Sequence, residues 1–276
     1  YKRQNAALSN GKNVILSDGK TYLVKSAATL SEDDSFLGGT GTIKCDTASF
    51  AEQTQFVSVT GDNCTIADIS IDSDSNTTGW AVHVSSATNT VIRNVTGKNS
   101  GQALIVVGDT AVDTYVTQCY QKSEGYGILV DDPTGSSGLF ATDNRFIYSG
   151  GADGHGDGIE INAPTNGFER FVISGNYIEG YIDYQTNHGI GIGASKGYHG
   201  VITNNVINDV EADGIHLEYC EHIVVDGNVF HDIGPASYTG DGHGVAVYDS
   251  EQIVISNNII DTASYGYGII VHAYPD

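Results

Sequence analysis

Short runs in which aliphatic residues alternate with variable ones recur along the chain, and a glycine opens each of them. Alternation with a period of two residues predicts β-strands with one face in the core. The pattern glycine, aliphatic, any residue, aliphatic occurs as GILV (127–130), GIEI (158–161), GIGI (189–192), GIHL (214–217), GVAV (244–247) and GIIV (268–271). The sequence therefore predicts a series of similar short strands.

A second motif follows four of these runs at a similar distance. Its copies are VISGNYI (172–178), VITNNVI (201–207), VVDGNVF (224–230) and VISNNII (254–260), with less regular copies at 64–72, 80–86, 90–97 and 103–109. Two motifs that advance in step predict successive coils of a parallel β solenoid. The asparagines of the second motif, which then stack as a structural ladder in a turn, are Asn176, Asn205, Asn228 and Asn258. A leucine-rich repeat or a propeller is disfavoured, because leucine is scarce, helical spacing is missing and the chain has one tryptophan.

This repeat resembles the right-handed parallel β-helix of pectate lyases, polygalacturonases, alginate epimerases and phage tailspikes. The resemblance covers roughly residues 13–273, and KNVILSDGKTYLVKSAATL (12–30) with GGTGTIKC (38–45) resembles the opening coil of tailspikes. It implies an all-β fold and a single domain over residues 1–276. We expect an opening coil over 1–45, repeating coils over 46–276 and no cap at the C-terminal end.

The net charge and the cysteines of the chain narrow the range of binding partners and sites that we expect. The chain has 34 Asp and Glu against 12 Lys and Arg, a net charge of -22, and only Arg170 and Lys196 are basic after residue 150. Nucleic acid and anionic membranes need a basic surface, so neither is an expected partner. No apolar run is long enough for membrane insertion. The four cysteines lack metal-site spacing and are expected to be buried thiols, although a Cys45–Cys64 disulfide between neighbouring coils remains open.

Alternation within the strands assigns outward positions. With the aliphatics of GIEI inward, Gly158, Glu160 and Asn162 point outward. One outward column is then predicted to be Leu129, Glu160, Gly191, His216, Ala246 and Ile270. The next is Asp131, Asn162, Gly193, Glu218, Tyr248 and His272. The turn before these strands carries Tyr126, Asp157, His188, Asp213, His243 and Tyr267.

This face is the candidate active groove, because Glu160 and Glu218 flank two glycine positions that leave room for a sugar ring. The candidate catalytic residues are Glu160, Glu218, Asp157, His188 and His216. The candidate substrate-binding residues are Asp183, Tyr184, Lys196, Asp213, His243, Tyr248 and Tyr267. Turn-capping and solvation of strand ends are the simpler interpretation of the Asp and His column. No protein-bound metal site is predicted.

The fold resemblance implies action on a polysaccharide by hydrolysis, elimination or epimerisation. Hydrolysis needs two carboxyl groups flanking the glycosidic bond, and the two-coil separation of Glu160 and Glu218 predicts backbones about 9–10 Å apart. Asp157 or Asp183 is an alternative second member. Hydrolysis without a cofactor is the preferred hypothesis. A lyase or C5-epimerase would use His188, His216, Tyr184 or Tyr248 as the base, with calcium. A fibre or adhesin that only binds glycan is the third hypothesis.

Two motifs carry a weaker likeness to polygalacturonases. GDGIEI and NHGIGIGASKG are similar to two signatures of that family, with Asp157 and His188 at the matching positions. The family's intervening aspartate pair and its Arg-x-Lys motif are missing, and so is the Tyr-Gly-Phe-Asp-Pro-His motif of alginate epimerases. The likeness to tailspikes implies a polysaccharide partner and an extracellular or virion-surface location, and it leaves a homotrimer open.

Overall fold

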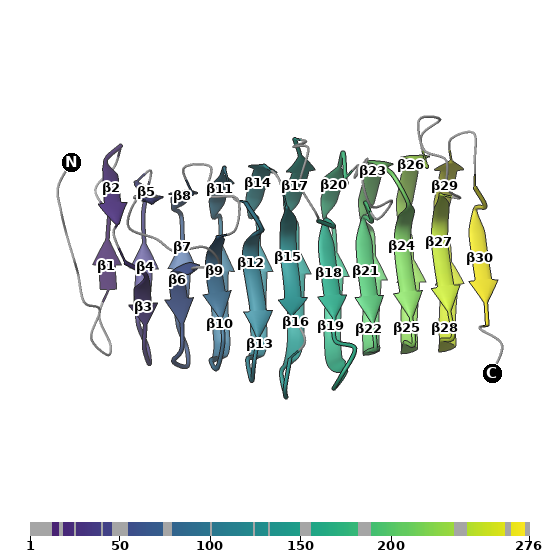
Figure 1. Ribbon diagram of the computed structural model, residues 1–276, viewed down its shortest axis with the longest axis horizontal. Helices are drawn as coiled ribbons and strands as arrows, with labels where there is room; N and C mark the ends of the chain where they lie inside the picture. Colours follow the sequence, from purple (N-terminus) through teal and green to yellow (C-terminus); the bar gives the residue numbers. More distant parts are fainter. Residues whose placement is uncertain are drawn as a thin grey trace.

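The computed structural model describes residues 13–16, 19–24, 26–39, 41–45, 55–73, 79–99, 101–123, 125–131, 133–149, 156–181, 189–234, 242–262 and 266–273. These residues form three parallel sheets, here called A, B and C, of ten strands each. The coils lie side by side along the long axis of the molecule, from the N-terminus to the C-terminus (Figure 1). The predicted all-β parallel solenoid is confirmed.

Each coil contributes one strand to each sheet, in the order A, B, C. Sheet A consists of β1 (Asn13–Ile15), β4 (Ser35–Leu37), β7 (Thr65–Ala67), β10 (Thr88–Arg93), β13 (Val112–Thr117), β16 (Ser137–Thr142), β19 (Phe168–Ser174), β22 (Gly197–Thr203), β25 (Glu221–Asp226) and β28 (Glu251–Ser256). Sheet B consists of β2 (Thr21–Val24), β5 (Thr42–Cys45), β8 (Ser70–Asp72), β11 (Thr96–Lys98), β14 (Tyr120–Ser123), β17 (Arg145–Tyr148), β20 (Tyr177–Glu179), β23 (Val206–Val210), β26 (Val229–Ile233) and β29 (Ile259–Thr262). Sheet C consists of β3 (Ala28–Leu30), β6 (Gln55–Val59), β9 (Trp80–Val84), β12 (Ala103–Gly108), β15 (Tyr126–Asp131), β18 (Ile159–Asn162), β21 (Ile192–Ser195), β24 (Asp213–Glu218), β27 (His243–Tyr248) and β30 (Ile269–His272). The predicted opening segment, residues 1–45, contains β1 to β5.

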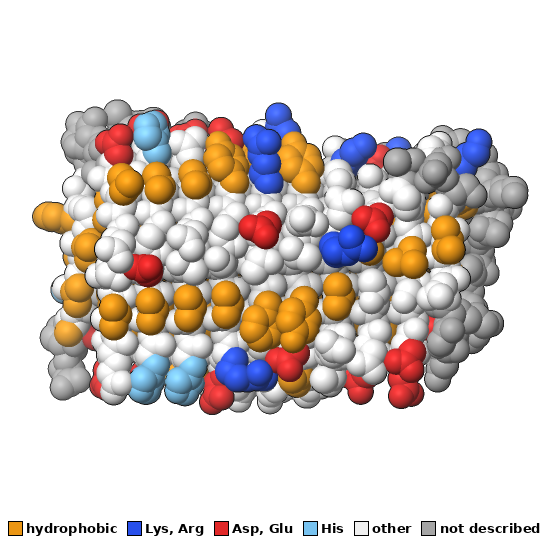
Figure 2. Space-filling model, turned by 180° about the vertical axis from the view of Figure 1, so that it is seen from behind, with side chains coloured by type: hydrophobic (Ala, Val, Ile, Leu, Met, Phe, Trp, Pro, Cys, Tyr) orange, Lys and Arg blue, Asp and Glu red, His pale blue; other side chains and the backbone are white. Residues whose placement is uncertain are grey.

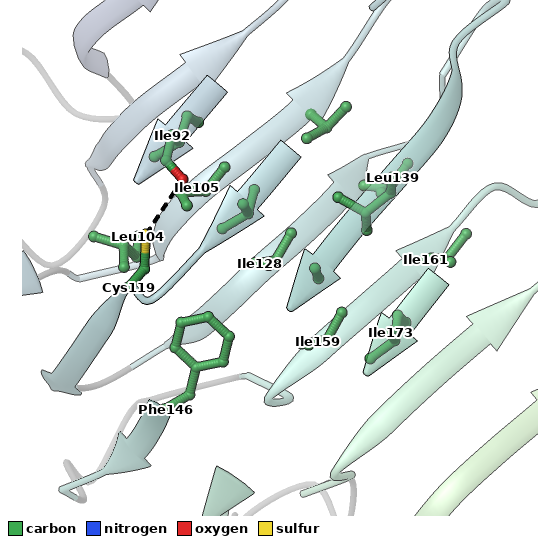
Figure 3. Packing of buried hydrophobic residues seen from close by; sticks show 14 of the residues in the cluster. Ile92, Leu104, Ile105, Cys119, Ile128, Leu139, Phe146, Ile159, Ile161 and Ile173 are labelled. Carbon is green, nitrogen blue, oxygen red and sulfur yellow. Dashed lines mark hydrogen bonds between the residues drawn. The ribbon is translucent and has the colours of Figure 1, made fainter. Parts of the chain in front are cut away.

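The core is a stack of inward aliphatic side chains, one layer per coil. Ile105, Ile128 and Ile159 of sheet C pair in register and are completely buried. Figure 3 shows these side chains packing inside the solenoid with residues of the other strands, such as Leu139 and Phe146. Removing this apolar surface from water drives the stacking.

The four cysteines belong to the same interior. All four are buried thiols, and none of them is in a disulfide. The Cys45–Cys64 disulfide that the spacing left open is therefore not formed. Burial raises the pKa of the Cys119 thiol to about 12, which keeps this thiol protonated and unreactive.

The predicted asparagine ladder is confirmed in the turn from sheet A to sheet B. Asn176 donates from Nδ2 to Oδ1 of Asn205 at 2.9 Å, and Asn205 donates in the same way to Asn228 at 2.9 Å. Asn144 extends the ladder by one coil, since it donates to Asn176 at 2.9 Å. The residue before each ladder position has a positive φ, which explains the Gly, Asn or Asp there. Buried turn amides are thereby satisfied coil after coil.

The side of the solenoid opposite to that in Figure 1 is chemically repetitive. Figure 2 shows hydrophobic side chains in rows that follow the long axis. On sheet A, Val172, Val201, Val224 and Val254 occupy equivalent positions in neighbouring coils. Sheet C instead changes its outward residue type from coil to coil. None of the described residues forms a helix that could cross a membrane.

Candidate active site

Strand pairing on sheet C fixes which side chains are neighbours. Glu160 of β18 pairs with Gly193 of β21, and Gly193 pairs with His216 of β24. The first outward column is therefore Leu129, Glu160, Gly193, His216, Ala246 and Ile270. The second column is Asp131, Asn162, Ser195, Glu218, Tyr248 and His272.

The prediction for the coil of β21 was wrong by two residues. Gly191 does not lie in an outward column, because it aligns with Gly158 and Gly214 at the corner before the strand. A Cβ on Gly191 would lie 2.5 Å from the carbonyl oxygen of Gly214, and one on Gly158 would lie 2.4 Å from Ile178 of the core. Gly158 was therefore also wrongly predicted to point outward. The sequence GIGIGA repeats every two residues, so its pattern fits both registers.

The same two-residue shift changes two further predictions: which residue of this coil lies in the turn before the strand, and how many outward positions lack a side chain. Ile190, and not His188, stands between Asp157 and Asp213, because Gly158 donates to its carbonyl oxygen and Gly191 donates to that of Asp213. The second outward column has Ser195 at this coil, so only Gly193 lacks a side chain there. The candidate residues Asp183, Tyr184 and His188 lie outside the described residues.

Asp157 and Glu160 form a carboxyl pair beside Gly193. Asp157 is 7% exposed and accepts a hydrogen bond of 2.8 Å from the backbone N–H of Ile190. A hydrogen bond also joins the two carboxyl side chains, and the Tyr126 hydroxyl makes a further one to Glu160. Burial and the negative charge of Glu160 raise the pKa of Asp157 well above its usual range. Burial raises the pKa of Glu160 as well. The pair therefore retains a proton more readily than isolated carboxyl groups do.

The glycine beside this pair leaves space that a side chain would occupy. A Cβ at Gly193 would lie 3.6 Å from Cγ of Glu160 and 3.7 Å from Oδ2 of Asp157. Both distances are ordinary contacts, so the backbone does not require glycine at this position. Gly193 is itself buried, so what the structure shows is that no side chain at this position separates Glu160 from the strand that carries His216.

On the other side of Gly193, Asp213 lies between two histidines. Its Oδ2 is 2.7 Å from Nδ1 of His216, and its Oδ1 is 2.7 Å from Nδ1 of His243. The backbone N–H of His243 also donates to Oδ1 at 3.2 Å. Burial of Asp213 favours its neutral form, but the hydrogen bonds and charges of the two histidines outweigh burial and lower its pKa. Asp213 is therefore an anion that orients both rings.

The two histidines differ in access. The His216 side chain is 27% exposed and stacks on Tyr248, with ring centroids 5.0 Å apart. The His243 side chain is 6% exposed, its Nε2 atom has no hydrogen-bond partner, and its ring stacks on Tyr267 at 5.8 Å. His216 can therefore contact a molecule on sheet C, whereas His243 is buried and makes hydrogen bonds to Asp213.

The other predicted residues lie further from Gly193. Glu218 is on the same strand as His216 but in the second column, so its backbone is about 12 Å from that of Glu160 by strand spacing and rise. Lys196 follows β21 in the turn toward sheet A, where its Nζ atom donates to the carbonyl oxygen of Pro164. Among all described residues, no three His, Cys, Asp or Glu side chains are arranged to hold a metal ion.

Two tyrosines near the carboxyl pair were absent from the predicted site. Tyr126 was placed correctly in the turn column, one coil before Asp157, but its contact with Glu160 was not foreseen. Tyr181 is 1% exposed, and burial together with the charge of Asp157 raises its pKa. Its hydroxyl has no hydrogen-bond partner. Tyr181 follows β20 and lies outside the two repeat motifs, so the alternation of inward and outward residues did not place its side chain.

Comparison with known proteins agrees with this architecture. The family model described as right handed beta helix region matches residues 81–275. The fold is thus a right-handed parallel β-helix. The chain belongs to this family. No curated protein sequence matches the chain.

Solved structures of similar fold include phage tailspikes and a hydrolase from Aspergillus tubingensis. The Dettilon tailspike protein has a TM-score of 0.65 at 12% identity, with 91% of this chain and 56% of that chain covered. The endo-xylogalacturonan hydrolase from Aspergillus tubingensis has a TM-score of 0.63 at 12% identity, with 94% and 88% covered. A tailspike of E. coli bacteriophage HK620, solved with a pentasaccharide, has a TM-score of 0.62 at 12% identity, with 95% and 58% covered. The chain thus spans little more than half the length of the tailspikes, and the likeness shows a shared fold.

Proposed function

We propose that the protein binds a polysaccharide along the outer face of sheet C and hydrolyses a glycosidic bond over Gly193. The observation that carries this proposal is the arrangement around that glycine. The proton-retaining pair of Asp157 and Glu160 lies one coil before it, and the hydrogen-bonded pair of Asp213 and His216 lies one coil after it. An acid and a base on either side of a position without a side chain are the groups that glycoside hydrolysis requires.

The carboxyl pair supplies the general acid. Glu160 is the more exposed member and pairs with Gly193, whereas Asp157 is buried beside it. The proton that the pair holds passes to the glycosidic oxygen as the bond breaks, and the pair becomes more negative. Tyr126 and the Ile190 N–H hold the two carboxyl groups in place. A raised pKa keeps the acid protonated to a higher pH than an ordinary carboxyl group.

His216 is the candidate base that activates the attacking water. Its backbone is two coils from that of Glu160, or about 10 Å. This spacing leaves room for a sugar and a water, as in an inverting reaction. Asp213 holds the Nδ1 proton, so that Nε2 can accept one. Glu218 is the alternative base, but it lies further along the strand from Glu160.

A lyase is the second candidate, and the His216–Asp213 pair is the observation that favours it. An oriented imidazole can abstract the C5 proton of a uronate, while a protonated carboxyl pair can hydrogen-bond the sugar carboxylate. Calcium is the cofactor to test with this alternative and with epimerisation. Hydrolysis needs no added cofactor in this proposal.

The comparisons support a glycan as partner. One neighbour of similar fold is a hydrolase of xylogalacturonan, and another was solved with a pentasaccharide. The two tailspikes support a location outside the cell or on a virion surface, and a homotrimer is the assembly to test by light scattering. A fibre that binds glycan without cleaving it is the alternative that product analysis separates.

Product analysis of digested polysaccharides tests the proposed reaction. Bacterial surface polysaccharides and pectic polysaccharides are incubated with the protein, with and without calcium. Hydrolysis predicts new reducing ends without new absorbance near 235 nm, whereas elimination predicts both. Epimerisation changes the sugar composition without shortening the chains. Glycan binding without any of these changes would overturn the enzymatic proposal.

A further inference from the structure

A second surface lies on sheet C, on the N-terminal side of the carboxyl pair. Ala103, Val106 and Leu129 form a buried hydrophobic cluster that is separate from the interior of the solenoid. Val106 and Leu129 belong to the outward column that continues to Glu160, yet they are 1% and 5% exposed. Trp80 and Tyr126 pack against the cluster and remain partly exposed. We call these five residues the apolar platform.

The indole of Trp80 is held in place at one end of the platform. Its Nε1 donates a hydrogen bond of 2.8 Å to Oε1 of Gln102, and its ring lies 4.9 Å from that of His83 at an angle of 60°. A Cβ on Gly108 would lie 3.2 Å from Nε2 of His83, so the glycine leaves room for that imidazole. An aromatic ring that is already fixed loses little freedom when a ligand stacks on it.

The electrostatics of the platform favour a neutral ligand. Burial lowers the pKa of His83, and the opposing effects of Asp109 and Asp131 do not reverse this shift. A neutral imidazole can donate and accept hydrogen bonds at the edge of the apolar surface. The nearby charges acting on His83 are both negative, which disfavours a uronate or another anionic sugar here.

The platform is continuous with the candidate active site. Tyr126 packs against the platform and also makes a hydrogen bond to Glu160. Trp80 on β9 lies three strands before β18 in sheet C, a distance of about 14 Å by strand spacing. One strand spacing is comparable with the length of a sugar unit. A glycan that reaches both Trp80 and Glu160 therefore lies along the long axis of the solenoid.

We propose that the apolar platform is a binding subsite for a neutral sugar with an apolar substituent, such as a 6-deoxy methyl or an N-acetyl group. This inference rests on the proposed function for the direction of the glycan, but sugar binding at Trp80 is measurable without cleavage. The apolar face of the sugar stacks on Trp80, its substituent contacts the exposed part of Tyr126, and His83 binds a hydroxyl group, while the buried cluster holds the two aromatic rings in place.

Tryptophan fluorescence reports on ligand binding at the apolar platform, because Trp80 is the only tryptophan of the chain. Fluorescence of the full chain is titrated with methyl α-L-fucopyranoside, N-acetylgalactosamine and glucuronic acid. We expect a saturable change with at least one of the first two sugars and none with glucuronic acid. Absence of a change with both neutral sugars, or an equal response to glucuronic acid, would overturn the proposal.

Variants separate stacking from a general effect on the fold. By saturation-transfer NMR, W80A should weaken binding of the responsive sugar about tenfold, whereas W80F should bind like the wild type. Y115A is the matched control, since Tyr115 is an exposed aromatic residue that stacks on Phe140 of sheet A at 4.8 Å. Unchanged binding by W80A, or equal loss by Y115A, contradicts the subsite.

Cleavage assays distinguish this inference from the proposed function. On a polysaccharide that the protein cleaves, W80A should raise KM about tenfold with kcat unchanged. E160Q should lose cleavage and keep the fluorescence response. If sugars perturb Trp80 but no polysaccharide is cleaved, the subsite stands and the proposed reaction fails. If cleavage depends on Glu160 but not on Trp80, the reaction stands and the subsite fails.

Discussion

The Nδ1 atom of His216 lies 2.7 Å from Oδ2 of Asp213, and the other carboxylate oxygen of Asp213 is engaged by His243. An anionic partner at Nδ1 fixes the ring orientation and the tautomer, which leaves Nε2 as the basic atom. This relationship turns His216 from an outward histidine on a sheet into a candidate general base.

The first prediction concerns Asp213. D213N removes the charge that orients His216, so we expect kcat to fall by about 100-fold and the low-pH limb of the profile, where a general base becomes protonated, to move. D226N is the matched control, because Asp226 also accepts two side-chain hydrogen bonds, from Ser256 and Asn257, but lies on sheet A. Steady-state kinetics against pH check both variants. Equal kcat values for D213N and D226N would exclude this positioning role.

The second prediction concerns the pH dependence of stability. The pKa of Asp157 is raised in the folded state, so its contribution to stability is complete below its ordinary pKa of about 3.8 and is lost as the pH rises through the raised value. In this window the free energy of unfolding should fall by up to about 1.4 kcal/mol per pH unit from this group. D157N should remove that part of the slope in chemical denaturation.

Asp213 makes the stability of the fold depend on pH in the opposite direction, and it does so in a different pH range. Its pKa is lowered in the folded state, so its stabilisation is present above its ordinary pKa of about 3.8 and is lost as the pH falls through the lowered value. The free energy of unfolding of D213N should therefore depend on pH differently from that of the wild type below about pH 4.

For Asp157, the contradicting result is a D157N variant whose free energy of unfolding depends on pH above about pH 4 as that of the wild type does. Such a result would show that Asp157 titrates normally.

The third prediction compares two neighbouring glycines. G193A places a Cβ in ordinary contact with both carboxyl groups, so stability should change by less than about 1 kcal/mol. The same methyl group occupies the position over which the sugar is proposed to bind, so it should lower kcat/KM about 10-fold or more. G191A forces a Cβ to 2.5 Å from a backbone oxygen and should cost roughly 2–3 kcal/mol of stability. The reverse order of stabilities would mean that the strand register is wrong.

The fourth prediction concerns the asparagine ladder. Asn205 is completely buried and donates to both Asn228 and the carbonyl oxygen of Ile173. N205A leaves buried partners unsatisfied and should cost about 2–4 kcal/mol in thermal or chemical unfolding. N208A is the control, because the Asn208 side chain is only partly buried and its one described hydrogen bond is with His231. A cost below 1 kcal/mol for N205A would contradict a structural ladder.

Much of the fold could be predicted because each coil repeats the same physical requirements. Inward aliphatics recur at strand spacing, and the buried asparagine follows a residue that tolerates a positive φ. Both signals are local in the sequence, so they predicted the solenoid and the ladder from Asn176 to Asn258. The position of Asn144 was missed because its strand motif is less regular.

The site could be predicted only in part, because contacts between coils depend on register. GIGIGA fits two registers, and corner packing at Gly191 decides between them. The Asp157–Glu160 contact within one coil depends on how the chain bends at Gly158, which alternation does not describe. The platform at Trp80 was missed because the outward column was followed only over the regular coils, from Leu129 onward.

The central claim is that a glycosidic bond is cleaved over Gly193, between Glu160 and His216. A crystal structure of E160Q, soaked with an oligosaccharide from a polysaccharide that the wild type cleaves, tests it most directly. The account predicts a glycan along the long axis on sheet C, with one glycosidic oxygen within hydrogen-bond distance of the residue 160 side chain. A glycan bound on sheet A or B, or one on sheet C with no glycosidic oxygen near Gly193, would contradict it.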